Sequence, residues 1–282
     1  MNIPKYIELF RNEITRKGFR PATIKNYVSC IEVFLKYFDG KVTEPIKINE
    51  QQIKDYLGTF KQHNTQRANH SAIKCFFLYT LKQPNKFKYI EYCKRDRKLP
   101  IVLSVDEIQK MFNACTNTKH KAILSLLYSA GLRVSEVINL KITHIDSSRM
   151  IINILNAKGG KDRQVMLNKS VLELLRSYYK MYKPKEYLFN GQNSLQYSSR
   201  SINEFLKIYA DKAGIENKRV YAHLMRHTSF THMVENGTDI NLIQKLAGHS
   251  SVKTTLIYTH ISHNLIKNIQ SPISNINYEN SR

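Results

Sequence analysis

The sequence predicts a mainly α-helical protein in two parts, with one small β-hairpin or sheet in the second part. Three observations support this fold class. Apolar residues recur at helical spacing through most of the 282 residues. A stretch without such spacing, residues 84–103, divides the chain. Alternating apolar residues flank a Gly-Gly pair at 159–160, which is typical of a hairpin.

Residues 1–83 are predicted to form four helices. The first follows Pro4 and ends at Gly18, and the second starts at Pro21 and keeps apolar residues at helical spacing up to Phe38. Two more helices are predicted over residues 48–63 and 64–82. Together they predict a small helical domain.

Residues 84–103 are predicted to be an interdomain linker. They contain "KRDRK" at 94–98, just before Pro100. Such a charge run is either a solvated loop or a cationic strap that lies along phosphates, and the sequence supports both interpretations equally.

A second domain is predicted over residues 104–262. Ser104 and Glu107 fit a capping box at the start of a helix. A buried helix follows, broken at Gly131, and then the hairpin, with strands around Ile152 and Val165. The remaining predicted helices cover residues 171–182, 198–214, 223–232, 239–248 and 250–260.

The charge of the chain predicts a polyanionic partner. Lys and Arg number 44 against 22 Asp and Glu, for a net charge of +22 that both halves share. Nucleic acid is favoured over a generally basic surface, because no lysine-rich tail holds the excess. Four cysteines without a CxxC pair, no signal peptide and no apolar run long enough for a membrane span predict an intracellular protein.

The stretch "HLMRHTSFTH", residues 223–232, concentrates imidazole beside a guanidinium. His223 and His227 are four apart, as two zinc ligands on one helical face would be. Arg226 shares that face, however, and the glutamate of an HExxH helix is absent. An anion therefore suits these groups better than a metal ion, and no metal or cofactor is expected.

Six residues could together carry out phosphoryl transfer. They are Arg133, Lys158, His223, Arg226, His249 and Tyr258. The first five supply donors to phosphate oxygens, and a tyrosine hydroxyl is a plausible nucleophile towards phosphorus. We expect the cationic neighbours to lower the pKa of the tyrosine. Taken singly, each residue also has an ordinary structural explanation, for example Arg133 pairing with Glu136.

Four segments resemble the tyrosine site-specific recombinases, the phage-integrase and Xer-like family: "AGLRVSEVINL", "AKGGKDR", "HLMRHTSFTHM" and "LAGHSSVKTTLIYTH". The order Arg, Lys, His-x-x-Arg, His, Tyr is the family's order. The resemblance covers essentially the whole chain, because residues 1–83 look like the family's SAM-like core-binding domain. It implies that residues 104–262 form an α+β catalytic domain.

The resemblance also implies a reaction. Tyr258 would attack the scissile phosphate of duplex DNA, giving a 3′-phosphotyrosyl link and freeing a 5′-hydroxyl. Lys158 would protonate the leaving oxygen, and His223 would assist proton handling at the nucleophile. Strands would be exchanged between two sites through a Holliday junction, without metal or ATP.

The other implied roles concern the phosphate. Arg133 and Arg226 would grip its non-bridging oxygens, and His249 would hydrogen-bond the transition state. Glu136 matches an acidic position that orients the site. We assign the extra imidazole of His227 to packing or hydrogen bonding.

The expected partners are duplex DNA with a specific recombination site and other protomers in a synaptic tetramer, identical or paralogous. Further DNA contacts are predicted for Lys25, Arg67, Lys74, Arg95, Arg97, Lys98, Lys161 and Arg163. The tail, residues 263–282, contains a short amphipathic segment that docks either on a neighbouring protomer or on its own domain. We expect a cytoplasmic, nucleoid-associated protein.

Two alternatives share this pattern. One is a DNA-relaxing topoisomerase of the tyrosine type, which uses the same chemistry. The other is a DNA-binding protein that keeps the fold without catalysis, although loss of catalysis would most readily alter Tyr258 or an arginine, and both are present.

Overall fold

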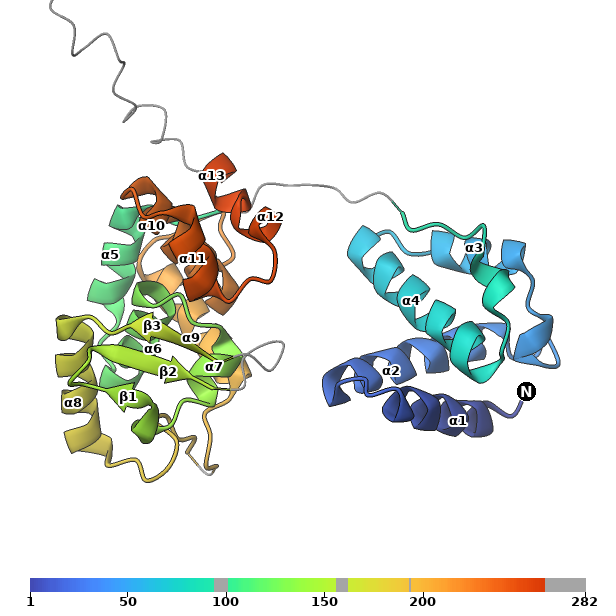
Figure 1. Ribbon diagram of the computed structural model, residues 1–282, viewed down its shortest axis with the longest axis horizontal. Coiled ribbons are helices and arrows are strands. Elements are labelled where there is room, and N and C mark those ends of the chain that lie inside the picture. The colour runs from blue at the N-terminus through green and yellow to red at the C-terminus, as the bar shows by residue number, and fades with distance from the viewer. Residues whose placement is uncertain (94–100, 156–161, 193, 262–282) are drawn as a thin grey trace, which may run out of the picture. The chain divides into compact units, whose positions relative to one another are not determined.

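The computed structural model describes residues 1–93, 101–155, 162–192 and 194–261, without the side chains of 260 and 261. The chain divides into two compact units, Met1–Lys98 and Leu99–Arg282 (Figure 1).

The N-terminal unit is helical. Its elements are α1 (Ile3–Arg16), α2 (Pro21–Phe38), η1 (Pro45–Lys47), α3 (Glu50–Gly58), α4 (His63–Cys75), η2 (Phe76–Thr80) and η3 (Pro84–Phe87). The π-helical turn η2 directly continues α4. Phe10, Ile31, Phe34, Phe76 and Phe77 are fully buried and form the centre of the unit's core. The four predicted helices are confirmed, with the last one ending in the π-helical turn.

The predicted linker begins too early. Phe87 and Ile90 are buried in the core of the N-terminal unit, and His70 Nε2 lies 2.8 Å from the carbonyl oxygen of Ile90. At the other end, Leu103 is fully buried in the second unit. Residues 84–93 therefore belong to the first unit, while 94–100 lie outside the described residues.

The C-terminal unit contains nine of the described helices and one sheet. They are α5 (Val105–Ala114), α6 (Thr118–Ser129), α7 (Val134–Ile138), α8 (Lys169–Tyr182), α9 (Ser199–Lys212), α10 (Ala222–Glu235), α11 (Ile240–Ala247), α12 (Val252–Thr255), α13 (Ile257–Ile261), and the strands β1 (Ile145–Asp146), β2 (Ile151–Ile154) and β3 (Arg163–Met166). A turn of 3₁₀ helix, η4 (Ile142–His144), leads into β1. The predicted capping box is present, since Ser104 Oγ accepts from Glu107 N at 3.1 Å and Glu107 Oε2 accepts from Ser104 N at 2.6 Å.

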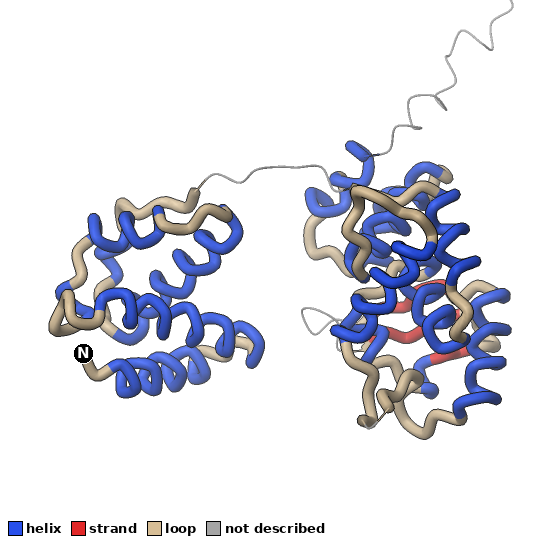
Figure 2. Tube along the Cα trace, turned by 180° about the vertical axis from the view of Figure 1, so that it is seen from behind, coloured by secondary structure: helices blue, strands red, loops and turns tan. Residues whose placement is uncertain are grey.

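The sheet is antiparallel in the order β1-β2-β3. Ile152 pairs with Val165, and both side chains are buried. The strands lie in front of the helices in Figure 1 and behind them in the opposite view of Figure 2, so the sheet covers one face of a helical body. The predicted fold class is confirmed. The two-residue strand β1 was not predicted, because it is too short to show alternation.

Helix α10 runs through the interior of this unit. Ten of its residues are buried, including polar ones such as Thr228 and Thr231. Thr228 Oγ1 accepts a hydrogen bond from the backbone N–H of Leu103 at 3.1 Å, which fixes the start of the unit. A helix buried on most sides shows little amphipathic pattern, which fits the mixed composition of residues 223–232. Among the described residues, no helix is long and apolar enough to cross a membrane.

Candidate active site

Three arginine side chains converge on the C-terminal end of α11. This helix ends in a Schellman motif: Gly248, with φ of +60°, donates to Lys245 O, and His249 N donates to Gln244 O. The motif leaves the last two carbonyl groups of the helix, Leu246 and Ala247, without helical donors. Arginines supply the donors instead, and the negative end of the helix dipole favours their charge.

Arg226 is the most deeply buried of the three. Its side chain is held by α10, and the residue is only 1% exposed. Nη1 donates to Gly131 O at 2.6 Å, Nη2 donates to Ala247 O, and the guanidinium lies 4.7 Å from the Phe230 ring centre. Burial, followed by the charge of Arg133, lowers the pKa of Arg226 to about 10. It therefore remains charged at neutral pH, in surroundings that favour an anion nearby.

Arg133 reaches the same carbonyl from the turn between α6 and α7. Its Nη2 donates to Ala247 O at 3.0 Å, and its Nη1 donates to Glu136 Oε1 at 2.8 Å. Gly131 makes this turn possible. It has φ of +57°, and a Cβ there would lie 2.6 Å from Phe230 Cζ. The turn thus brings Arg133 and Arg226 to one acceptor.

Glu136 is the carboxylate of the cluster. It accepts from Arg133 through both its oxygens, and it also forms a two-pronged ion pair with Arg163 at 2.8 and 2.7 Å. Burial acts to raise the pKa of Glu136, but the hydrogen bond and charge of Arg163 and the hydrogen bonds of Arg133 outweigh burial and bring the pKa to about 2. It is ionised at neutral pH.

Arg163 corrects a prediction. We expected this residue to contact DNA, but its side chain is only 8% exposed, and its donors serve Glu136 and Leu246 O. The signal that separates it from other basic residues is its place at the start of a predicted strand, where burial alternates along the chain. A sequence shows the positive charge of Arg163 but not its burial, and charged residues are usually at the surface, which is why the prediction was wrong.

His249 is positioned by its neighbours on both sides. Gln244 Nε2 donates to the His249 carbonyl at 3.1 Å, and the imidazole Nδ1 lies 3.0 Å from Thr255 Oγ1. The other ring nitrogen, Nε2, lies 3.5 Å from Arg226 Nη2. Burial and then the charges of Arg226 and Arg133 lower the pKa of His249 to about 4, so the ring is neutral at pH 7.

Tyr258 lies beside His249. The two rings are stacked, with centres 6.3 Å apart and an interplanar angle of 18°. His227 and Phe230 contact the tyrosine ring from α10, at 5.7 and 5.5 Å between ring centres. Tyr258 is 1% exposed.

The expected effect on the tyrosine hydroxyl is wrong in direction. Burial raises the pKa of Tyr258, and although Arg226 and Arg133 act to lower it, burial outweighs both. In this structure the hydroxyl is therefore protonated at neutral pH, and attack would require a proton acceptor.

His223 and His227 lie one turn apart on α10, with ring centres 4.4 Å apart at 71°. His223 is exposed at the start of the helix. His227 is half-buried, its Nδ1 has no hydrogen-bond partner among the described residues, and burial, followed by His223 and Arg226, lowers its pKa to about 4. Within the described ranges, no group of three or more His, Cys, Asp or Glu residues is arranged to hold a metal ion.

The other predicted contacts divide into three groups. Lys158, Lys161, Arg95, Arg97, Lys98 and the tail segment lie outside the described residues. Lys25 and Lys74 are exposed on α2 and α4. Arg67 has an additional role within the N-terminal unit.

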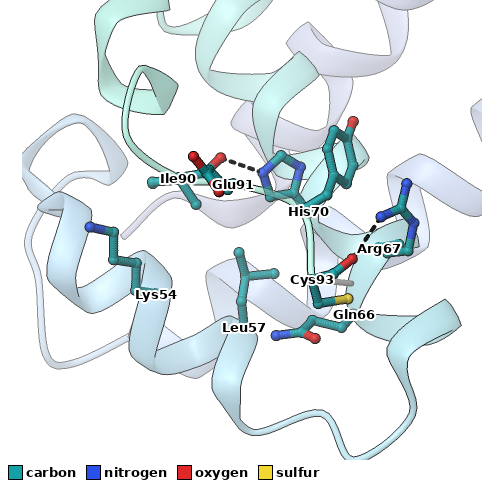
Figure 3. Close-up of a pocket in the computed structure, with 9 residues that line it drawn as sticks. Lys54, Leu57, Gln66, Arg67, His70, Ile90, Glu91 and Cys93 are labelled. Atoms are coloured by element: carbon teal, nitrogen blue, oxygen red, sulfur yellow. Dashed lines mark hydrogen bonds between the residues drawn. The ribbon is translucent and has the colours of Figure 1, made fainter. Parts of the chain in front are cut away.

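Arg67 holds the end of the described N-terminal segment. Its Nη1 donates to Cys93 O at 2.8 Å, and its guanidinium lies 4.6 Å from the Tyr92 ring centre. Arg67 and His70 line a pocket of about 290 Å³. Figure 3 shows the two side chains there, each hydrogen-bonded to a carbonyl of residues 90–93. The DNA contact that we predicted for Arg67 stays a prediction.

Comparisons with known proteins agree on one family. Residues 102–264 match the model described as "Phage integrase family", and residues 6–86 match "Phage integrase, N-terminal SAM-like domain". A putative integrase/recombinase of Sinorhizobium fredii is 34% identical, covering 91% of this chain and 84% of that protein. Tyrosine recombinase XerD of Staphylococcus epidermidis is 30% identical, covering 94% and 95%.

Solved structures show the same likeness. XerA recombinase is 30% identical, covers 94% of this chain and 96% of its own, and gives a TM-score of 0.56. XerH recombinase, solved with its difH substrate after cleavage, is 23% identical over 86% of this chain and 78% of its own, with a TM-score of 0.74. At this level of identity, the similarity to XerH shows a shared fold.

Proposed function

Because the chain belongs to the phage integrase family, we propose that it is a site-specific DNA recombinase that cuts and rejoins duplex DNA through Tyr258. Its substrate is duplex DNA carrying a recombination site, and its place of action is the nucleoid.

One observation carries the proposal. Arg133 and Arg226 donate to the same carbonyl, and within the described residues the three guanidinium groups of the cluster have one carboxylate, Glu136, which pairs with Arg133 and Arg163. The cluster therefore keeps an excess positive charge beside His249 and Tyr258. A buried excess of this kind is stabilised by an anion, and in a chain of net charge +22 the anion is a phosphate of DNA.

The cluster suits a phosphoryl transition state. Both arginines retain donors beyond those used for carbonyls and Glu136, and these can bind two non-bridging oxygens. In the proposed step a bond forms between the Tyr258 oxygen and phosphorus, and the bond from phosphorus to the 5′-oxygen breaks. The tyrosine proton leaves towards His223, and Lys158 protonates the 5′-oxygen. The phosphotyrosyl ester keeps the energy of the broken phosphodiester, so neither ATP nor a metal is required.

We further propose that protomers act together. XerH was solved on palindromic difH DNA, and lambda integrase as a dimer on a core site. A synaptic tetramer of this chain, alone or with a paralogue, would provide one Tyr258 per strand. The family match does not favour the topoisomerase or the non-catalytic alternative.

Covalent trapping tests the function. Nicked random-sequence duplexes are incubated with the protein, denatured, and the DNA that stays attached is sequenced. A nick next to the cleavage point lets the freed fragment leave, so the adduct accumulates. Tyr179→Phe is the matched control, since Tyr179 is an exposed tyrosine of α8.

Adducts from wild type and Tyr179→Phe, but not from Tyr258→Phe, support the proposal, and a shared motif gives the site. Adducts from Tyr258→Phe would assign the nucleophile elsewhere. Tight DNA binding by the wild type without any adduct would favour the non-catalytic alternative or a required second kind of protomer.

A further inference from the structure

We propose that Arg163 is a positioning residue: it holds Glu136 and the end of α11 in the arrangement that presents Arg133 and His249 to the phosphate. This inference rests on the proposed function. Arg163 itself touches no reacting atom in this arrangement.

The contacts of Arg163 join three elements. From the start of β3, its Nη1 and Nη2 donate to the two oxygens of Glu136 at 2.8 and 2.7 Å. Its Nε donates to Leu246 O at 2.7 Å. The same guanidinium thus binds the carboxylate on α7 and the last turn of α11. Planar, two-pronged pairs of this kind fix orientation as well as distance.

Glu136 transmits this position to Arg133. Each oxygen of the carboxylate accepts one bond from Arg163 and one from Arg133: Oε1 from both Nη1 atoms, and Oε2 from Arg163 Nη2 and the Arg133 backbone N–H. The carboxylate is shared evenly between the two arginines. Without Arg163, each carboxylate oxygen would lose one of its two bonds, and the orientation in which Glu136 holds Arg133 would no longer be fixed.

The end of α11 transmits the position of Arg163 to His249. Leu246 O is held by Arg163, while the next carbonyl, Ala247 O, accepts from Arg133 and Arg226. Gly248 follows, and a Cβ there would lie 3.2 Å from Arg163 Cδ, so the aliphatic part of Arg163 also lies against this turn. His249 is the next residue, and a shift of the turn would move its imidazole directly.

Two other roles are possible for a basic residue here, DNA contact and general stability. A phosphate contact would change affinity and its salt dependence, and the 8% exposure of the side chain disfavours it. A purely structural role would change the stability of the fold but not how the cleavage rate depends on pH.

The test compares the full-length wild type with Arg163→Met and Arg163→Lys at saturating nicked duplex. The control is Arg149→Met, since Arg149 is a surface arginine beside the same sheet with 76% of its side chain exposed. We expect Arg163→Met to form the covalent adduct on the order of 100-fold more slowly, as for other misplaced groups. DNA affinity and its salt slope should match the wild type.

The dependence of the adduct rate on pH tests whether Arg163 acts through Glu136. The groups that face Glu136 are Arg133, Arg163 and Arg226, and removal of Arg163 takes away the largest of the contributions that oppose burial, so the pKa of this carboxyl rises. Because only the ionised Glu136 holds Arg133, the adduct rate of Arg163→Met should rise with pH over a range in which Glu136 of the wild type is already ionised. In Arg163→Met/Glu136→Gln this added dependence should disappear, and the second substitution should slow the reaction far less than it slows the wild type.

Several results would overturn the inference while the wild type still forms adducts. One is an adduct rate of Arg163→Met equal to that of the wild type, and another is a change confined to DNA affinity and its salt slope. The third is a slower adduct rate that lacks the added pH dependence and whose effect is fully additive with that of Glu136→Gln. If Arg163→Met does not fold, Arg163→Lys carries the same comparisons, because one ammonium cannot replace both prongs. Absence of adducts from the wild type would instead contradict the proposed function.

Discussion

Arg133 and Arg226 donate hydrogen bonds to the same atom, the carbonyl oxygen of Ala247, each through Nη2. Residues separated by 93 positions thereby share one anchor at the end of a helix, and the donors that remain can converge on one anion. Because both guanidinium groups donate to this carbonyl oxygen, the two like charges are held close to each other despite their repulsion.

The shared anchor predicts that lysine cannot replace Arg226. A lysine can point one ammonium at either Gly131 O or Ala247 O, but it lacks the planar fork that reaches both and still faces the phosphate. We expect Arg226→Lys to slow adduct formation by about 10²–10³-fold at saturating DNA, as for loss of a transition-state donor. A rate within threefold of wild type, in a folded protein, would argue against this role.

Thr255 is predicted to hold the imidazole of His249 in place. Its hydroxyl can either accept from or donate to Nδ1, so it supports both neutral tautomers, including the one whose Nε2 donates to a phosphate oxygen. We expect Thr255→Val to slow adduct formation by roughly tenfold or more, with DNA affinity unchanged. Thr254→Val is the control, since Thr254 is exposed one position earlier. Equal rates for the two variants would exclude the role of Thr255.

Lys158 is predicted to act as the general acid, from the resemblance alone. We expect Lys158→Ala to slow cleavage of an ordinary substrate by about 10²–10⁴-fold. A substrate with a 5′-thiol leaving group, which needs no proton, should recover much of the rate. Lys161→Ala serves as control, because a lost phosphate contact is not repaired by a better leaving group. Absence of rescue in Lys158→Ala would remove it from the role.

The grouping of Arg133, Arg226, His249 and Tyr258 was predictable because these residues follow a recognisable order and spacing. Arg226 lies on α10, His249 directly after the cap of α11 and Tyr258 on α13, so their separation along the chain is constrained by the fold. The anchors were not predictable, because Gly131, Leu246 and Ala247 act through backbone carbonyls, which any residue provides.

Two errors have a common physical cause. Arg163 was grouped with surface cations, and the pKa of Tyr258 was expected to fall, because charge is visible in a sequence and burial is not. The early start of the linker is similar: Phe87 and Ile90 are apolar but lie among lysines and tyrosines without periodicity. Only packing reveals that they complete a core.

The buried histidines predict a loss of stability in mild acid. The pKa of His249 is lowered from 6.5 to about 4, as is that of His227, with burial as the first cause of each shift. Between these values the unfolded chain binds more protons than the folded one. The contribution of each histidine to the free energy of unfolding is therefore greatest above pH 6.5 and falls as the pH drops to about 4.

Urea unfolding at pH 7 and pH 5 measures this effect. The difference in stability between the two pH values should be smaller in His249→Asn than in wild type. The pKa values of His70, His120 and His144 are also lowered, so only the comparison between proteins isolates His249. An unchanged pH dependence in His249→Asn would contradict the prediction.

Gly131 is predicted to be irreplaceable for two separable reasons. Its φ of +57° costs other residues about 1–2 kcal/mol, and a Cβ would collide with Phe230 Cζ at 2.6 Å. Gly214 provides a matched control in the same unit: its φ is +67°, but no atom lies within 4 Å of the position that a Cβ would take. Gly214→Ala should therefore show the backbone cost alone, while Gly131→Ala should lose about 1–3 kcal/mol more by urea unfolding.

The collision also links stability to catalysis. Phe230 packs against Tyr258 and under the Arg226 guanidinium, so a methyl group at Gly131 would displace both through one ring. Gly131→Ala should then slow adduct formation even where the protein is fully folded, and Gly131→Ala/Phe230→Leu should regain part of the stability by making room. Equal losses of stability in Gly131→Ala and Gly214→Ala would mean that the turn at Gly131 adjusts without moving Phe230. The coupling between Gly131 and Phe230 would then be refuted.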